Sequence, residues 1–497
     1  MVKQKKRSFM SKLFSRRILL LIQFIVSIIF LGCIYILKML PMKYYLILCG
    51  IIFLLWMLSS LLIKSGIKKK KRENKYARLI FGKLLSLILS IALGFVSVMA
   101  FKGNNFLSNI TGSFTQTRVI CMYVKKESAI KSLRDVKDNT EIGIASEKGS
   151  KNITSAIAKI ENKANKDFQT KDYKDYSLLG DAIMDGDIDV IVADNAYMAL
   201  LEANHEGIDE NLKSLYKVEI QEKLNSVTQE TNVTKNPFIV YMTGIDTYGT
   251  VSAISRADVN LAVCVSPIQK QILIVSIPRD TQITLHKNGK MDKLTHSAMY
   301  GINETISSIE DFLDLKVNYY AKTNFSGITN IIDALGGVTI DSPYEFTTLH
   351  GHYHINKGIN QMDGDKALCF VRERYNLPSG DYDRGRNQQK LLKAMLNKAM
   401  SPKIITNFQR ILTAIEGCFE TNMSSDEIKS LINMQLDDNA EWDVFNVQLD
   451  GKGYMTDQTY SMHGTSIYVM KPYASYVKKI TKLIDRVEDG DKITEND

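Results

Sequence analysis

The stretch FVRERYNLPSGDYDRGRNQQ, residues 370–389, holds the most informative pattern in this 497-residue chain. It predicts the end of a buried strand, a loop with Pro and Gly, and the first turn of a helix. Guanidinium groups form bidentate contacts with phosphate oxygens, so closely spaced arginines indicate a phosphorylated ligand. Carboxylates among them hold a metal or orient the arginines, which a nonspecific basic surface does not need. The charged and amide residues of the stretch are Arg372, Arg374, Asp381, Asp383, Arg384, Arg386 and Gln388.

The first hundred residues predict a membrane anchor. Three apolar runs are each long enough to cross a hydrocarbon core of about 30 Å as a helix; they cover residues 18–37, 44–63 and 79–101. The first run is too long for the core of a signal peptide, and two more spans follow it, so we expect no cleavage. The tail 1–17 and the loop 64–78 are strongly basic, which places both in the cytoplasm and everything after Lys102 outside the cell.

The charge distribution argues against nucleic acid as a partner. The chain has a net charge of +9, but residues 1–101 contain 18 Lys and Arg and one acid, Glu73. The remainder therefore holds 45 basic and 53 acidic residues, a balance of −8. The positive excess lies beside the membrane, where it binds anionic lipid headgroups. The arginine cluster is local within an acidic exterior, which disfavours diffuse DNA binding.

The exterior is too long for one core, so we expect an α/β accessory domain at 113–225 and a larger α/β domain at 236–487. Short apolar runs alternate with helical patterns in the first, which predicts some parallel strand pairing. The tail 488–497 is predicted to be disordered. In the larger domain the predicted strands are 237–246, 256–267, 270–280 and 367–374, and the predicted helices are 303–315, 326–337 and 385–400. The second and third strands form a candidate hairpin about Pro267.

Charged residues cluster at the ends of these strands, where open α/β sheets place their ligands. Asp246 follows the first strand, and Asp258 lies at the start of the second. Across adjacent strands these two carboxylates could hold a hard divalent cation such as Mg²⁺. The arginines expected around the anionic group are Arg256, Arg279, Arg372, Arg374 and Arg384. The alternative is a set of exposed ion pairs at strand ends, which contribute little.

Other motifs carry weaker signals. His350, His352 and His354 would share one face of a strand, as in some metal sites, but no second ligand cluster supports them. A disulfide between Cys264 and Cys369 is left open, although buried free thiols explain both positions equally well. The chain contains neither a GxSxG serine context nor a Walker lysine loop, which argues against a serine hydrolase and a P-loop kinase.

The motifs GID (244–246), SRAD (255–258), SIPRDT (276–281), FVRER (370–374) and GDYDRGRNQQ (380–389) resemble the LytR-CpsA-Psr (LCP) family of membrane-anchored cell-wall transferases. The resemblance spans about Phe238 to Met400. It implies an α/β fold with a central mixed sheet flanked by helices. Three membrane spans followed by an additional α/β module resemble the capsule-locus, CpsA-like members in particular.

The resemblance implies an extracellular, Mg²⁺-dependent phosphotransferase, anchored in the cell membrane of a Gram-positive type of cell. It would move a glycopolymer, capsular polysaccharide in this subgroup, from undecaprenyl pyrophosphate onto peptidoglycan. Other capsule-assembly proteins are further candidate partners. The implied catalytic residues are Asp258, Arg279, Asp381 and Arg384. The implied pyrophosphate ligands are Arg256, Arg279, Arg372, Arg374, Arg384 and Gln388, and the implied metal ligands are Asp246 and Asp258.

Two structural expectations complete the implied site. The polyprenyl tail needs an apolar tunnel, for which the helices around ITNIIDAL and LLKAMLNKAM are candidates, with ordinary core packing as the alternative. Many family members have Arg where this chain has Asn387, and Arg386 points about 100° away on a helix. Arg386 is therefore left out of the site.

Two other functions remain compatible with these residues. A regulator that senses lipid-linked sugar would use the same exterior, but its cytoplasmic segments are too short to fold a DNA-binding domain. A pyrophosphatase acting on the same lipid would use the same metal and arginines, with water in place of the acceptor.

Overall fold

The computed structural model describes residues 15–38, 40–68, 73–111, 115–145, 150–201, 205, 207–224, 228–245, 251–401, 404–494 and 497. Contacts divide these residues into two compact units. The first unit contains the N-terminal helices together with segments 400–413 and 424–440. The second contains the remaining described residues, including a five-stranded sheet, a six-stranded sheet and four two-stranded sheets.

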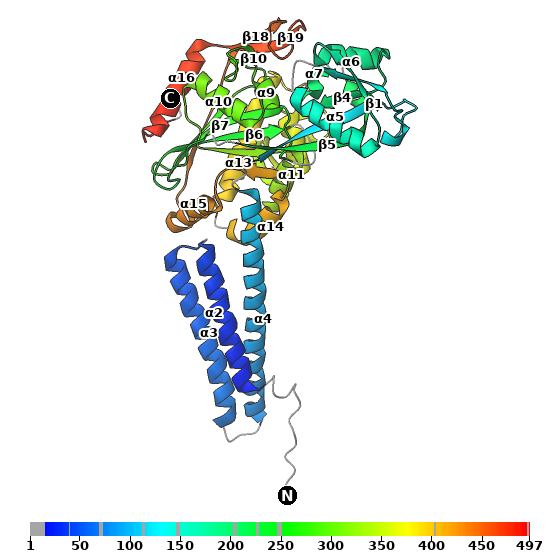
Figure 1. Cartoon of the computed structure of the whole chain (residues 1–497). Coiled ribbons are helices and arrows are strands. Elements are labelled where there is room, and N and C mark those ends of the chain that lie inside the picture. Colours follow the sequence, from blue (N-terminus) through cyan, green and yellow to red (C-terminus); the bar gives the residue numbers. More distant parts are fainter. Residues whose placement is uncertain are drawn as a thin grey trace. The chain divides into compact units, whose positions relative to one another are not determined.

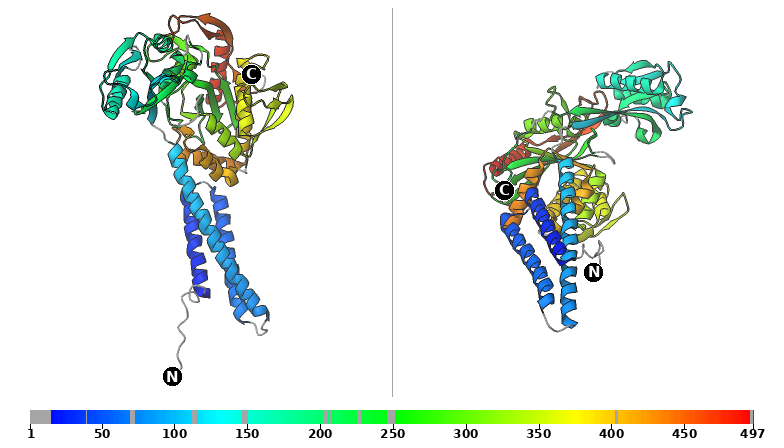
Figure 2. Two further views of the ribbon diagram at one scale, coloured as in Figure 1. Left: turned by 90° about the vertical axis from the view of Figure 1, so that its right-hand side faces the viewer. Right: turned by 60° about the horizontal axis from the view of Figure 1, so that its bottom comes forward.

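Three long apolar helices form the bundle of the first unit, and they run side by side in all views (Figures 1 and 2). They are α2 (Arg16–Leu37), α3 (Met42–Lys68) and α4 (Glu73–Ile110). Each is long and apolar enough to cross a membrane, which confirms the three predicted spans. The bundle is joined by side chains that donate to carbonyls of a neighbouring helix: Trp56 Nε1 to Leu20 O (3.2 Å) and Ser86 Oγ to Leu19 O (3.3 Å).

A helix from near the C-terminus belongs to the same unit. Helix α15 (Ser425–Asp438) contacts the bundle through an ion pair between Asp437 Oδ1 and Lys43 Nζ (2.6 Å) and a hydrogen bond from Lys429 Nζ to Asn104 Oδ1 (2.9 Å). Lys43 lies at the start of α3 and Asn104 near the end of α4. The start of α3 and the end of α4 therefore make polar contacts with α15, a helix from the C-terminal half of the chain.

The second unit begins with a five-stranded sheet in the order β3-β2-β4-β1-β5. Strands β2, β3 and β4 pair in parallel, and β1 pairs antiparallel with β4 and β5, as the mixed pattern of strands and helices predicts. Two apolar clusters cover it, one with α5 and one with α6 and α7. The strands are β1 (Thr115–Lys125), β2 (Glu141–Ala145), β3 (Gln169–Tyr173), β4 (Ile191–Asp194) and β5 (Leu212–Lys223), and the helices are α5 (Ser150–Ala164), α6 (Tyr176–Asp185), α7 (Met198–Leu201) and α8 (Ile208–Asn211).

The larger sheet has the order β16-β11-β6-β7-β8-β17. Strands β6, β7 and β8 are antiparallel, whereas β6 with β11 and β8 with β17 are parallel, so the sheet is mixed as expected. The β7–β8 pair is the predicted hairpin about Pro267. The strands are β6 (Phe238–Ile245), β7 (Ala257–Ser266), β8 (Gln271–Ser276), β11 (Tyr319–Thr323), β16 (Phe419–Thr421) and β17 (Asp443–Gln448).

Helices flank this sheet on both faces. Helices α10 (Ile302–Leu313) and α16 (Ala474–Glu488) pack their apolar stripes against β6, β7 and β8 in one cluster. A second cluster joins α11 (Phe325–Ala334), α12 (Gly364–Arg372) and α13 (Asp381–Ala399) to a small sheet. Gln389 of α13 donates to Val447 O (2.7 Å) in β17, which attaches this layer to the sheet. The remaining short elements are β9 (Gln282–Thr284), β10 (Met291–Lys293), α9 (Leu294–Ser297), β12 (Val338–Ser342), β13 (Phe346–Thr347), β14 (His354–Ile355), β15 (Gly358–Met362), α14 (Ile404–Ile415), β18 (Gly451–Thr456) and β19 (Ile467–Pro472).

Two predictions about this domain are wrong. The run 367–374, predicted as a strand, lies largely in helix α12, whose N-cap Asp363 accepts from Lys366 N (2.9 Å). Gly364 lets α12 approach α11 closely, because a Cβ there would lie 2.3 Å from Thr329 O. The C-terminal tail, predicted to be disordered, packs onto the domain: Ile493 is 2% exposed and its N–H donates to Gln271 Oε1 (3.0 Å).

Candidate functional site

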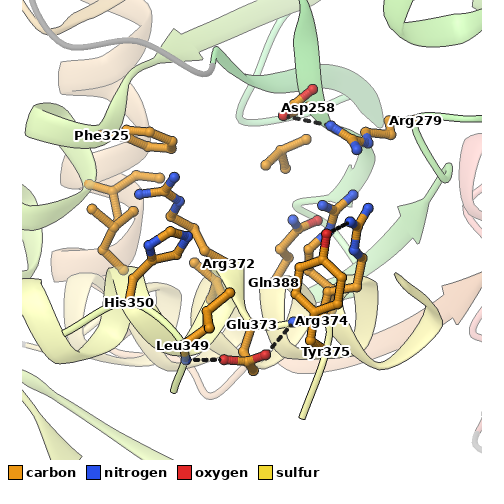
Figure 3. Close-up of a pocket in the computed structure, with 15 residues that line it drawn as sticks. Asp258, Arg279, Phe325, Leu349, His350, Arg372, Glu373, Arg374, Tyr375 and Gln388 are labelled. Atoms are coloured by element: carbon orange, nitrogen blue, oxygen red, sulfur yellow. Dashed lines mark hydrogen bonds and ion pairs between the residues drawn. The ribbon is translucent and has the colours of Figure 1, made fainter. Parts of the chain in front are cut away.

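The residues of the arginine motif surround a cavity of about 190 Å³ in the second unit (Figure 3). On one side the cavity is bounded by the start of strand β7 and the turn that follows β8, and on the other by helices α11, α12 and α13. Its lining includes four arginines and two carboxylates, so the side chains around it carry a net positive charge. The lining residues are Asp258, Val259, Arg279, Phe325, Ile328, Leu349, His350, Leu368, Val371, Arg372, Glu373, Arg374, Tyr375, Arg384 and Gln388.

Asp258 and Arg279 form the sheet side of the cavity. Arg279 Nη1 donates to Asp258 Oδ2 at 2.9 Å, and both side chains are about four-fifths buried. Burial alone would raise the pKa of Asp258, but neighbouring guanidiniums hold this pKa below its ordinary value. Those guanidiniums belong to Arg279, Arg256 and Arg384. Asp258 is therefore an anion at neutral pH.

The second carboxylate oxygen of Asp258 accepts no hydrogen bond from the described residues. This oxygen, Oδ1, is also buried. A buried carboxylate oxygen without a donor is costly, and a hard cation is a group that would satisfy it. The donor chemistry of Asp258 therefore fits Mg²⁺. Asp246, the second predicted ligand, lies outside the described residues.

Arg384 and Asp381 form a second ion pair at the start of α13. Arg384 Nη2 lies 2.6 Å from Asp381 Oδ1, and the Arg384 side chain is 12% exposed. Burial, opposed by Asp381 and assisted by Arg279, lowers the pKa of Arg384. The lowered pKa shows that the guanidinium is only partly compensated by the acids around it. An anion in the cavity would supply the missing compensation.

The arginines at the end of α12 are held by aromatic rings. The guanidinium carbon of Arg372 lies 4.2 Å from the ring centre of Phe325, and that of Arg374 lies 4.5 Å from the ring centre of Tyr375. Arg374 also donates to the Tyr375 hydroxyl. Figure 3 shows Arg372 beneath Phe325 on the side of the cavity opposite Arg279. Stacking fixes the plane of a guanidinium while its N–H groups stay available to an anion.

Glu373, between these arginines, fixes the loop that carries them. Its Oε2 accepts from Leu349 N (2.5 Å), and its Oε1 accepts from Arg374 N (2.9 Å) and Asn376 N (3.0 Å). Burial would raise the pKa of Glu373, but these backbone amides hold it below its ordinary value. Glu373 was not among the predicted site residues. Its position as an acid between two arginines was the available signal.

Comparison with known proteins places this arrangement in a family. The model described as the LytR_cpsA_psr family matches residues 201–476, more than half of the chain. The chain belongs to the LytR-CpsA-Psr family. The match extends beyond the predicted 238–400 in both directions and includes both halves of the cavity. A second model, DNA polymerase processivity factor, matches residues 77–193, a smaller segment that begins inside the apolar helix α4.

Named relatives within the LytR-CpsA-Psr family are cell-wall transferases. A polyisoprenyl-teichoic acid–peptidoglycan teichoic acid transferase, TagU of Enterococcus faecalis, is 34% identical over 227 residues, covering 45% of this chain and 73% of that protein. TagU of Bacillus cereus (strain ATCC 14579) is 30% identical over 257 residues, covering 50% of this chain and 81% of that protein. The crystal structure of TagV from B. subtilis aligns with a TM-score of 0.45 and 25% identity, covering 51% of this chain and 98% of that one.

Two predicted site residues, Arg256 and Asp381, lie outside the lining of the LytR-CpsA-Psr cavity. Arg256 acts on Asp258 electrostatically but does not line the cavity. Arg386 does not line it either: its Nη1 lies 2.9 Å from Asp383 Oδ1, and its side chain is 55% exposed. Asn387 is buried and donates to Phe370 O (3.4 Å). Arg279, Arg372, Arg374, Arg384 and Gln388 are brought together as expected.

The apolar wall of the cavity differs partly from the prediction. Helix α11 contributes Phe325 and Ile328, as expected for the ITNIIDAL region. Helix α12, not the LLKAMLNKAM part of α13, supplies Leu368 and Val371, and Val259 and Leu349 complete the aliphatic lining. Leu391 of α13 is instead part of the core cluster beneath. The core-packing alternative is therefore correct for this part of α13.

The structure also shows where the three histidines and the two cysteines singled out in the sequence lie. The three histidines do not share a strand, because His350 and His352 lie in a turn and His354 in β14, so that prediction is wrong. Across the described ranges, no three His, Cys, Asp or Glu side chains form a metal-ligating group. Cys264 and Cys369 are free thiols in buried positions, not a disulfide.

Proposed function

We propose that this chain is a membrane-anchored phosphotransferase that moves a glycopolymer from a polyprenyl pyrophosphate carrier onto peptidoglycan. Capsular polysaccharide is the proposed polymer, and Mg²⁺ is the proposed cofactor. The observation that carries the proposal is the convergence of four guanidiniums on one cavity with an apolar wall. They come from the turn after β8, from α12, from the loop after α12 and from α13. Such a cavity suits a pyrophosphate group with a hydrocarbon chain attached.

The proposed reaction forms one phosphoester bond and breaks one phosphoanhydride bond. A hydroxyl oxygen of the acceptor attacks the phosphorus that carries the polymer, and the oxygen bridging the two phosphates leaves with the polyprenyl phosphate. The hydroxyl proton passes to a carboxylate or to the departing phosphate. Arg279, Arg372 and Arg374 bind the non-bridging oxygens, whose charge increases during transfer.

The acids have two roles in this scheme. Asp381 orients Arg384 through their 2.6 Å ion pair, and Asp258 orients Arg279 through Oδ2. Mg²⁺ would be held by Asp258 Oδ1 together with Asp246, and when bound it would neutralise charge on the pyrophosphate. Positioning and charge stabilisation account for most of catalysis in phosphoryl transfer, so the protein needs no covalent intermediate.

We further propose that the second unit lies outside the cell. The basic residues before α2 and between α3 and α4 favour a cytoplasmic location for those segments. Peptidoglycan and the finished lipid-linked polymer are then on the same side as the arginine cavity. A protease added to intact protoplasts should cut the region after α4 and leave the N-terminal tail protected.

The test compares Arg374, which lines the cavity, with Arg386, which does not. Arg374→Ala should abolish transfer of polymer from its lipid carrier to peptidoglycan by the purified full-length protein, whereas Arg386→Ala should retain it. Transfer that survives both Arg374→Ala and Arg372→Ala would refute the proposal. Removal of Mg²⁺ by a chelator should stop the reaction, and Mg²⁺ should restore it. Release of polymer phosphate without attachment to the acceptor would identify a pyrophosphatase.

A further inference from the structure

A second cavity, of about 200 Å³, lies within the second unit between the five-stranded sheet and the loop 457–465 that joins β18 to β19. One wall comes from the start of α6 and the other from this loop and the residue before β10. It shares no residue with the arginine cavity. Its lining includes Lys174, Asp175, Tyr176, Lys290, Tyr460 and His463.

Hydrogen bonds hold the loop wall in place. Tyr460 N donates to Met291 O (2.9 Å) and Ser461 N donates to Asp292 Oδ2 (2.9 Å). Asp292 is fully buried, and its other oxygen lies 2.7 Å from His296 Nδ1. The loop is therefore anchored to β10 and α9 through a buried carboxylate. A cavity with anchored walls is preformed, as ligand sites commonly are.

Tyrosine rings connect the two sides of this cavity. Tyr176 packs on Tyr197 with ring centres 5.0 Å apart, Tyr197 on Tyr300 at 6.1 Å, and Tyr300 on Tyr460 at 6.4 Å. The Tyr300 hydroxyl lies 2.9 Å from Ser461 Oγ. The row begins in the accessory module and ends in the loop of the larger domain. It presents a half-buried ring, Tyr460, at the cavity surface, with Lys290 Nζ 4.8 Å from the ring centre.

The β18–β19 hairpin links this cavity to the arginine site. Tyr468 of β19 is 45% exposed, and its pKa is raised by partial burial and by the carboxylates of Asp280 and Asp381. Met470 N in β19 donates to the backbone oxygen of Asp280, the neighbour of Arg279, at 2.8 Å. The hydroxyl of Tyr382, the neighbour of Asp381, donates to Gly451 O in β18 at 3.2 Å, so the hairpin borders the arginine site. Tyr454 of β18 is 36% exposed and donates to Gln282 Oε1 (2.9 Å). Exposed tyrosines thus lie along the hairpin whose connecting loop forms the second cavity.

We propose that the second cavity is a saccharide subsite, in which Tyr460 stacks against a sugar ring of a glycan chain that extends along the β18–β19 hairpin from the arginine site. This inference rests on the proposed glycopolymer transfer and adds where the sugar chain is held. A sugar has an apolar face of C–H groups and a rim of hydroxyls. Tyrosine supplies a rigid amphipathic surface for the face.

The polar groups of the cavity fit the rim of a sugar better than they fit other ligands. Lys174 and Lys290 donate hydrogen bonds, whereas Asp175 accepts them, so both signs of charge are present. An anion alone would be repelled by the carboxylate of Asp175. A sugar hydroxyl can accept from a lysine and donate to the Asp175 oxygen that does not cap α6, since Oδ1 already accepts from Leu178 N (2.9 Å). The small volume suits a short part of a chain, with the rest of the chain along the hairpin.

The experiment measures binding of two soluble probes to the full-length protein in detergent by isothermal titration. One probe is glycan strands freed from peptidoglycan by an amidase, which represent the acceptor. The other is the glycopolymer released from its carrier by mild acid, which represents the donor. Tyr460→Ala should weaken binding of one probe by about 2- to 10-fold, as expected for the loss of one ring contact. Tyr460→Phe should retain it, because the ring remains.

Three further variants make the result decisive. Lys174→Ala combined with Lys290→Ala changes only exposed rim residues, so weaker binding in this variant cannot come from misfolding. Lys163→Ala, on α5 and not in the cavity lining, should bind like the unaltered protein. Arg374→Ala should lose transfer but keep probe binding, which separates failure of the proposed function from failure of the subsite. The inference would be overturned if neither probe bound the unaltered protein. It would also be overturned if Tyr460→Ala and the double lysine variant bound both probes as tightly as the unaltered protein does.

Discussion

Replacement of Glu373 by Gln tests whether one buried carboxylate holds the arginine loop in position. Its two oxygens accept three backbone N–H groups, from Leu349, Arg374 and Asn376. A carboxamide keeps the shape but has one acceptor oxygen, so at least one of these amides would face an NH₂ group. A hydrogen bond to a charged group contributes about 1.5–3 kcal/mol, and we expect Glu373→Gln to destabilise the loop by about this amount.

Amide hydrogen exchange measures the effect directly. A loss of about 1.5–3 kcal/mol increases the open population of the loop by about 10- to 150-fold, and exchange at Leu349 should accelerate accordingly. Transfer activity should also fall, because Arg372 and Arg374 lie on either side of Glu373 and both line the cavity. A loop that opens more often presents the two guanidiniums in the binding geometry less often.

Glu345→Gln is the matched control, since the Glu345 side chain is 66% exposed and its partner His354 Nε2 lies 3.6 Å away. Exposed pairs of this kind contribute little, so exchange and activity should stay near those of the unaltered protein. If Glu373→Gln exchanged at Leu349 as slowly as the control, Glu373 would not be holding the loop. Normal exchange with lost activity would instead assign Glu373 a direct role in the reaction.

Three other perturbations follow from the same contacts. Phe325→Leu removes the ring that stacks on Arg372, and the loss of about 0.5–2 kcal/mol of cation–π stabilisation should raise the Kd for the lipid donor by about 2- to 30-fold. Unchanged affinity would show that the stacking does not matter for binding. Asp194→Ala leaves Arg118, whose side chain is 8% exposed, with Glu222 as its remaining acid, and thermal melting should show a loss of about 3 kcal/mol. The pKa of Glu373 is lower in the folded state than in the unfolded one. The stabilisation by its carboxylate is therefore complete above the ordinary pKa of about 4.3 and is lost as the pH falls through the lower folded value. Amide exchange at Leu349, followed as the pH is lowered, should show this loss, and Glu373→Gln should not show it.

The sequence predicted the four arginines that line the cavity, and a fifth, Arg256, that does not; it did not predict the helix that carries Arg372. Residues 367–374 form an apolar run with a β-like composition, and short runs of this kind do not distinguish a strand from a buried helix. The helix is selected by Asp363 at its N-cap and by Gly364, which permits close contact with α11. The cap is a local signal, three residues from its donor, that the strand-like composition outweighed. The glycine contact is a tertiary feature, since a glycine has no sequence pattern that reveals which backbone will approach it.

The partners of the charged groups were also beyond sequence reasoning. Phe325 precedes Arg372 by 47 positions, and no local pattern indicates that its ring will stack on that guanidinium. Leu349 donates to Glu373 from a separate turn. In contrast, Asp258 and Arg279 lie at the ends of two strands that form a hairpin, so their pairing follows from strand register. Local chemistry was predictable where adjacent strands fixed the distance.

The divided origin of the cavity bears on how it would bind its ligand. Asp258 and Arg279 belong to the sheet, whereas Arg372, Arg374 and Arg384 belong to helices and a loop in the α11–α13 layer. An anion between the two sides would contact guanidiniums of both, and its charge would offset the mutual repulsion that contributes to the lowered pKa of Arg384. Each arginine in the free protein is already oriented by an acid or an aromatic ring, so little side-chain ordering remains for the binding step. The same groups therefore account for the fixed positions of the guanidiniums and for the proposed preference of the cavity for a pyrophosphate.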